Sequence, residues 1–76
     1  MQVDVYTTKT CPYCFAAKGL LTERGIRFNE HDVSFDHSMR IKLMDKTGRR
    51  TVPQIFFNDQ HIGGFTDLEQ YFENQS

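Results

Sequence analysis

The sequence predicts an α/β domain, a mixed four-stranded sheet covered by three helices in the order β-α-β-α-β-β-α, spanning residues 1–76 as one unit. Two observations carry this prediction. Short apolar or β-branched runs alternate with longer stretches of helical spacing at the start, which is typical of a parallel βαβ unit with a right-handed crossover. Later, Asn58-Asp59 separates two strand-like runs, which indicates an antiparallel hairpin.

Three elements are expected in the first half of the chain. Residues 2–6 alternate apolar and polar side chains and form the first strand. A helix follows from Pro12 to about Arg24, because proline is favoured at the first helical position, and Gly25 is its stop signal. Residues 26–31 form the second strand, whose polar content places it at an edge of the sheet.

The second helix and the third strand come next. Ser34 is expected to cap a helix that runs to about Thr47 and stops at Gly48. Residues 54–57 are the most apolar strand-like run of the chain. A strongly apolar strand is typical of the buried middle of a sheet, so this one is expected at the centre.

The last elements are a short strand and a third helix. Residues 60–62 return antiparallel to the preceding strand. Thr66 and Glu69 match the S/T-x-x-E pattern of a capping box, so the third helix is expected to start there. The final residues 74–76 are expected to fray.

Composition narrows the class of function. The chain is 38% hydrophobic and 25% charged, which excludes disorder, and its formal net charge of −1 gives no basic excess for a nucleic acid or a membrane surface. No apolar run spans a bilayer, and Met1 leads into a strand rather than a signal peptide, so a cytoplasmic protein is expected. Two cysteines are too few for a secreted disulfide scaffold of this length.

The two cysteines lie in one stretch, Cys11-Pro12-Tyr13-Cys14. Residues three apart on a helix share a face, so the two sulfurs can meet. Since Pro12 starts the helix, Cys11 falls at the N-cap, where free N–H groups and the helix dipole favour a thiolate; we expect its pKa below the free value of about 8.5. Cys14, one turn inside, is expected to be more shielded. A reactive thiol beside a resolving thiol suits dithiol–disulfide exchange.

Zinc is the main alternative for these cysteines. His31 and His37 follow at a spacing that nearly imitates a Cys2His2 ligand set. The expected topology argues against it, because the cysteines of such a finger precede one helix that carries both histidines. Here the cysteines open a helix, while the histidines fall on a strand end and on the next helix. No metal is expected, and the three histidines are interpreted as solvated.

Three motifs together resemble the glutaredoxin family, in its dithiol CPYC class: Cys11-Pro12-Tyr13-Cys14, Thr51-Val52-Pro53-Gln54 and Gly63-Gly64-Phe65-Thr66-Asp67-Leu68. The resemblance implies a thioredoxin-like fold, glutathione as co-substrate and a cis peptide bond between Val52 and Pro53. It also implies that Cys11 is the nucleophile and Cys14 the resolving thiol. Phe65 departs from the cysteine often found at that position in the family.

The resemblance further implies a set of glutathione-binding residues: Lys9, Tyr13, Arg40, Thr51, Val52, Pro53, Gly64, Phe65, Thr66 and Asp67. Tyr13 and Val52 would flank the cysteine of the tripeptide. Lys9 and Arg40 would meet its glycine carboxylate. The N–H of Thr66 and the carboxylate of Asp67 would hold the γ-glutamyl end. Arg49-Arg50 is interpreted as a solvated pair.

The function expected from these residues is glutathione-dependent thiol–disulfide exchange, acting on protein disulfides and glutathionylated proteins, with ribonucleotide reductase as a substrate suggested by the family. A monomer is expected. Two alternatives stay open. One is a thioredoxin-like redoxin reduced by a flavin reductase. The other is a module that holds an iron–sulfur cluster through Cys11 and glutathione, which Pro12 disfavours by stiffening the helix start.

Overall fold

A computed structural model describes residues 1–75 and has the expected order of elements. Their bounds are β1 Val3–Thr7, α1 Pro12–Glu23, β2 Asn29–Asp32, α2 His37–Thr47, β3 Gln54–Phe57, β4 Gln60–Gly63 and α3 Phe65–Glu73. The strand order is β2-β1-β3-β4, with β1 and β2 parallel and the other pairs antiparallel. The mixed sheet, the central β3 and the edge position of β2 are confirmed.

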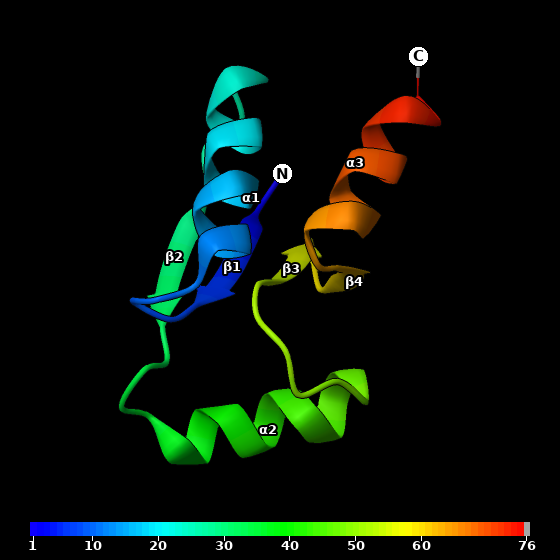
Figure 1. Cartoon of the computed structure of the whole chain (residues 1–76). Helices are drawn as coiled ribbons and strands as arrows, with labels where there is room; N and C mark the ends of the chain where they lie inside the picture. The colour runs from blue at the N-terminus through cyan, green and yellow to red at the C-terminus, as the bar shows by residue number, and fades with distance from the viewer. Residues whose placement is uncertain (76) are drawn as a thin grey trace.

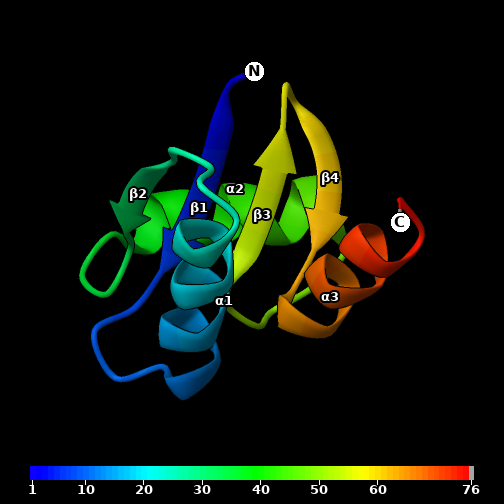
Figure 2. The same cartoon turned by 90° about the horizontal axis from the view of Figure 1, so that it is seen from above.

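The helices cover both faces of the sheet. α1 and α3 lie on one face, and α2 crosses the other (Figures 1 and 2). The core is accordingly divided by the sheet into two clusters. The larger, under α1 and α3, contains Val3, Val5, Ala17, Leu21, Ile55, Phe57, Leu68 and Phe72. The smaller, under α2, contains Val33, Leu43 and Phe56. Because β3 lies between both clusters, all four of its residues are buried.

β2 is shorter than the sequence indicates. It starts at Asn29, the partner of Asp4, and all four of its residues are exposed. Ile26 and Phe28, expected within the strand, lie before it and pack against the larger cluster. The reason is the end of α1: Gly25 has a φ of +71°, and the Ile26 N–H bonds back to the Leu21 carbonyl, so the chain is still leaving the helix there.

The N-cap of α2 is Asp36, and the prediction of Ser34 is wrong. Asp36 Oδ1 accepts a hydrogen bond from the Met39 N–H at 3.0 Å. Ser34 Oγ accepts instead from the N–H of Lys9 at 2.8 Å, so the hydroxyl is already engaged before the helix starts. Gly48, with a φ of +71°, ends α2 as expected.

The N-cap of α3 lies two residues before Thr66, the first residue of the predicted capping box, so that prediction is wrong too. The N-cap is Gly64, and Asp67, at the third helical position, accepts the Gly64 N–H through Oδ2 at 2.9 Å. Gly63 has a φ of +122°, a conformation that favours glycine, which lets the chain turn from β4 into α3.

The turn between β3 and β4 has the conformation that its sequence predicts. Asn58 and Asp59 have φ values of +49° and +69°, as a two-residue hairpin turn requires. The N–H groups of Asn74 and Gln75 still bond back into α3, and Ser76, also expected to fray, lies outside the described residues. None of the helices within residues 1–75 has the length and apolarity of a bilayer span.

Candidate active site

Cys11 and Cys14 form a disulfide bond at the N-terminus of α1, with their Cα atoms 5.2 Å apart. Cys11 is the N-cap, and its Sγ accepts a hydrogen bond from the Cys14 N–H at 3.1 Å, while Pro12 occupies the first turn. Cys11 is 7% exposed and Cys14 1%, so both the predicted cap and the greater shielding of Cys14 are confirmed. In the reduced protein, the same N–H favours a negative charge on the Cys11 sulfur.

The segment before β3 faces this sulfur. Cys11 Sγ lies 3.5 Å from the carbonyl oxygen of Val52, and the Val52–Pro53 peptide bond is cis, as expected. The buried side chain of Gln54 holds this segment, because its Nε2 donates a hydrogen bond to the Thr51 carbonyl at 2.8 Å. Gln54 Oε1 in turn lies 2.6 Å from His61 Nε2 on β4.

A hollow of about 260 Å³ lies between that segment and the start of α3. It is lined by Tyr13, Thr51, Val52, Pro53, Gly64, Phe65, Thr66 and Asp67. The structure therefore brings together eight of the ten residues that were expected to bind glutathione, from three separate motifs. Tyr13 and Phe65 form its apolar side, with ring centroids 6.3 Å apart.

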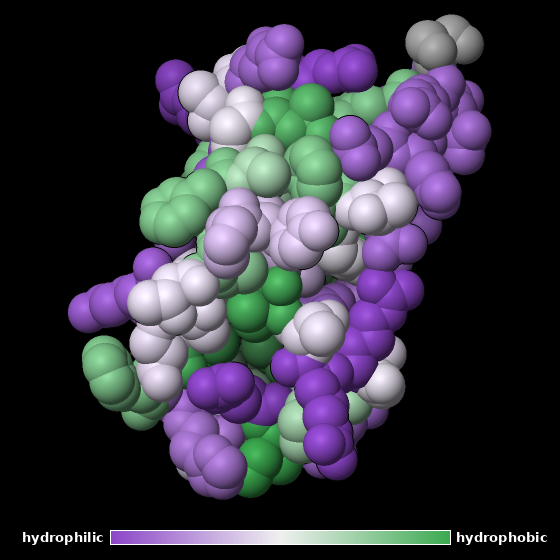
Figure 3. Space-filling model, in the orientation of Figure 1, coloured by the Kyte–Doolittle hydropathy of each residue, from purple (hydrophilic) through white to green (hydrophobic). Residues whose placement is uncertain are grey.

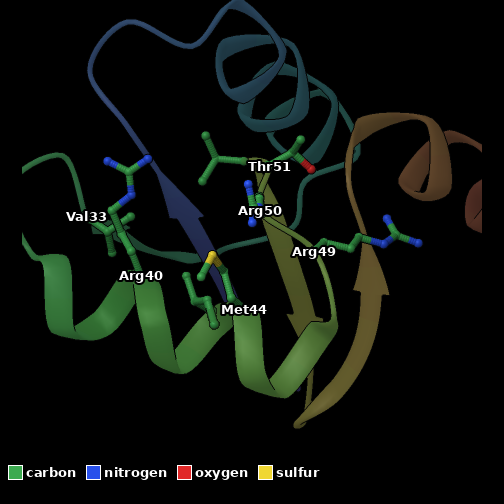
Figure 4. Close-up of a pocket in the computed structure, with 8 residues that line it drawn as sticks. Val33, Arg40, Met44, Arg49, Arg50 and Thr51 are labelled. Atoms are coloured by element: carbon green, nitrogen blue, oxygen red, sulfur yellow. The ribbon is translucent and has the colours of Figure 1, made fainter.

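Lys9 and Arg40, the other two expected residues, lie outside this hollow. They share a neighbouring one with the 8–10 turn, Ser34 and Phe35, where Lys9 Nζ lies 5.3 Å from the Phe35 ring centroid. A third hollow, of about 300 Å³, shares lining residues with both, Arg40 with one and Thr51 and Val52 with the other (Figure 4). Hydrophobic residues are visible among hydrophilic ones on this side of the molecule, between α2 and the other two helices (Figure 3).

Asp67 has a partner that the sequence did not suggest. Its Oδ2 lies 2.7 Å from Arg49 Nη1, in an ion pair, and also accepts the Gly64 N–H. The Arg49 hydrogen bond, followed by that of Gly64, lowers the pKa of the Asp67 carboxyl. Arg49 is exposed, as interpreted, but its side chain is also held in this ion pair. Asp67 and Arg49 are 18 positions apart and no local pattern links them. Arg49 and Arg50 are both exposed, and both line the third hollow.

The histidines are also more engaged than expected. His31 Nε2 pairs with Asp4 Oδ1 at 2.9 Å, and its ring stacks on Tyr6. His61 is half-buried against Phe56 and bonded to Gln54, and burial lowers its pKa. Within residues 1–75, no group of three or more His, Cys, Asp or Glu side chains is placed to hold a metal ion.

The sequence matches known proteins over most of its length. The family model described as Glutaredoxin matches residues 3–62. Glutaredoxin 3 of Escherichia coli K12 is 47% identical over 66 residues, which cover 87% of this chain and 80% of that protein. A glutaredoxin of Pseudomonas aeruginosa is 44% identical over 66 residues, with 87% and 79% coverage.

Solved structures agree with this match. The buckwheat glutaredoxin–glutathione complex superposes with a TM-score of 0.90 at 26% identity, covering 96% of this chain and 69% of the other. The solution structure of glutaredoxin from Brucella melitensis gives a TM-score of 0.87 at 40% identity, covering 97% and 80%. With this fold and a disulfide-forming cysteine pair, the chain belongs to the glutaredoxin family of thiol–disulfide oxidoreductases.

Proposed function

We propose that the protein is a glutathione-dependent oxidoreductase that reduces glutathione mixed disulfides and protein disulfides through Cys11 and Cys14. One observation supports this above all. The Cys11 sulfur, at the start of α1, lies 3.5 Å from the carbonyl of Val52, which lines the 260 Å³ hollow. A peptide in that hollow can therefore present its own sulfur to Cys11.

The chemistry around the hollow suits the parts of glutathione. The backbone of Val52 can pair with an extended tripeptide as an added strand would, and Tyr13 can cover its cysteine. At the γ-glutamyl end, the N–H of Thr66 opens α3 and suits a carboxylate, while Asp67 suits an ammonium group. Lys9 and Arg40, in the neighbouring hollow, supply positive charge for the glycine carboxylate.

Two exchange sequences follow for the two substrates. With a glutathionylated protein, the Cys11 thiolate attacks the glutathione sulfur, and the protein leaves as a thiolate. A second glutathione thiolate then attacks the sulfur of the bound glutathione, which yields oxidised glutathione and restores the Cys11 thiolate. Only Cys11 is needed for this sequence.

A protein disulfide requires both cysteines. The Cys11 thiolate attacks one substrate sulfur and forms a mixed disulfide, while the other substrate sulfur leaves as a thiolate. Cys14 then attacks the Cys11 sulfur, releases the second substrate thiol and forms the Cys11–Cys14 disulfide found in this structure. Two glutathione molecules reduce that disulfide in turn and leave as oxidised glutathione.

The test compares Cys11→Ser with Cys14→Ser in a glutathione-coupled assay, on a small glutathione mixed disulfide and on a protein disulfide. Cys11→Ser is expected to be inactive on both. Cys14→Ser is expected to keep activity on the mixed disulfide and lose it on the protein disulfide. Equal losses by both variants on both substrates would contradict the assigned roles. Full turnover with a flavin reductase and no glutathione would favour a thioredoxin-like redoxin instead.

A further inference from the structure

The ion pair between Arg49 and Asp67 connects two walls of the 260 Å³ hollow. Arg49 lies two residues before Thr51–Pro53, which form one wall, and Asp67 belongs to the helix start that forms the other. In Figure 4 the Arg49 side chain extends away from Arg40, toward the part of the chain where β4 leads into α3. The contact thus joins parts of the chain that are distant in sequence.

The geometry of the pair leaves half of the Asp67 carboxylate open. Arg49 Nη1 and the Gly64 N–H both donate to Oδ2, at 2.7 and 2.9 Å. Among the described residues, no hydrogen bond engages Oδ1. Two donors on one oxygen fix the orientation of the carboxylate. The side chain is 36% exposed, so a cation can approach the carboxylate from solvent.

The backbone around the pair is shaped to admit this carboxylate. A Cβ atom at Gly63 would overlap with Oδ2 and Cγ of Asp67, so only a glycine leaves room for the side chain in this position. The Arg49 hydrogen bond is also the largest cause of the lowered pKa of Asp67, so the carboxyl keeps its charge to a lower pH than an ordinary aspartate. The hydrogen bonds from Arg49 and Gly64 and the space at Gly63 therefore hold the ionised Asp67 carboxylate in one orientation.

We infer that Arg49 is a positioning residue, which holds Asp67 so that Oδ1 receives the α-ammonium group of a γ-glutamyl ligand. The inference rests on the proposed function, since it concerns recognition of glutathione in the same hollow. Arg49 does not need to leave, because the ammonium group takes the oxygen that Arg49 does not use. If Arg49 instead competed with the ammonium group for Asp67, removing it would strengthen recognition, which is the opposite outcome.

The experiment measures discrimination for the ammonium group. Two mixed disulfides are prepared with the same fluorescent thiol: one carries glutathione, and the other carries its deamino analogue, which lacks the α-ammonium group. Pre-reduced protein is mixed with each, and release of the fluorescent thiol gives the rate constant for transfer of the tripeptide to Cys11. The ratio of the two rate constants isolates the contribution of the ammonium group.

Four variants are compared with the unchanged protein: Arg49→Met, Arg49→Lys, Asp67→Asn and Arg50→Met. A charged hydrogen bond predicts that the unchanged protein prefers glutathione by about tenfold or more. Arg49→Met is expected to lose most of that preference, with the rate on the deamino analogue nearly unchanged, and Arg49→Lys to regain part of it. Arg50→Met is the matched control, because Arg50 makes no ion pair within residues 1–75, and it is expected to keep the full preference.

The outcomes separate this inference from the proposed function. Loss of the preference in Asp67→Asn together with full preference in Arg49→Met overturns the role of Arg49 and leaves that of Asp67 intact. An increased preference in Arg49→Met, or equal losses on both substrates, also overturns it. If Asp67→Asn keeps the full preference, Asp67 does not recognise the ammonium group, and the assignment of that residue falls with the inference.

Discussion

The carbonyl oxygen of Val52 and the Sγ of Cys11 lie 3.5 Å apart, while the N–H of Cys14 lies 3.1 Å from the same sulfur. In the reduced protein these two neighbours act in opposite directions. The N–H donates to a thiolate and stabilises it, whereas the carbonyl can only accept from a thiol. The position at the helix N-terminus adds to the effect of the N–H, so the thiolate is favoured on balance.

The first prediction concerns this thiol. The pKa of Cys11 in the reduced protein is expected to lie below the free value of about 8.5, because it caps α1. Ultraviolet absorbance of the thiolate, followed against pH in Cys14→Ser, reports Cys11 alone. The rate of alkylation against pH should give the same midpoint. A midpoint at or above that of free cysteine would mean that the carbonyl of Val52 dominates.

The second prediction uses two glycines in different conformations. Gly63→Ala is expected to destabilise the protein by more than about 1 kcal/mol, because its φ is +122° and the new Cβ would overlap with Asp67. Gly19→Ala is the matched control: the site is inside α1 with nothing within 4 Å of a Cβ, so stability should rise by about 0.5–1 kcal/mol. Urea unfolding measures both. Equal effects would contradict the conformation of Gly63.

The third prediction separates the two candidate caps of α2. Asp36→Ala is expected to lower stability by about 0.5–2 kcal/mol and to speed exchange of the Met39 amide hydrogen, whose acceptor is lost. Ser34→Ala is expected to expose the Lys9 amide hydrogen instead, because Ser34 Oγ is its acceptor. Hydrogen exchange followed by NMR distinguishes them. Faster exchange of the Met39 amide hydrogen in Ser34→Ala would instead support Ser34 as the N-cap of α2.

The fourth prediction is a pH dependence from His61. Burial lowers the pKa of His61 in the folded protein below its ordinary 6.5, so the unfolded chain binds the proton more readily. Stability is therefore complete above the unfolded pKa and falls as the pH drops from there toward the folded pKa. His61→Gln should remove this slope, and His37→Gln, at the exposed start of α2, should keep it. Urea unfolding between about pH 7.5 and pH 5 covers the window. A slope that persists in His61→Gln would show that another titrating group causes the pH dependence of stability.

Much of the fold could be predicted because the signals are local. Pro12 fixes the start of α1, Gly48 ends α2, and Asn58-Asp59 makes the hairpin turn with residues that accept positive φ. The cysteine site depends on the same kind of information. Once Pro12 is placed, the cap position of Cys11 and the shielding of Cys14 follow from helix geometry alone.

What could not be predicted depends on contacts between distant segments. Ser34 and Asp36 are both good caps, and the choice is made by Lys9, which occupies the serine hydroxyl from 25 positions away. The same holds for Arg49, whose partner Asp67 is 18 positions away. The sequence alone is equally compatible with a solvated side chain at Ser34 and at Arg49. Only the contacts in the folded chain show which partner each of them has.

The division of the core has a consequence for the local stability of the helices. α1 and α3 are fastened to the sheet by the larger cluster, whereas α2 contributes a single buried residue, Leu43, to the smaller one. Arg40 lies on α2, which has little buried surface, whereas Cys11 and Cys14 lie at the start of α1. Local opening of the helix that carries Arg40 is therefore expected to need less free energy than opening of the helix that carries the cysteines.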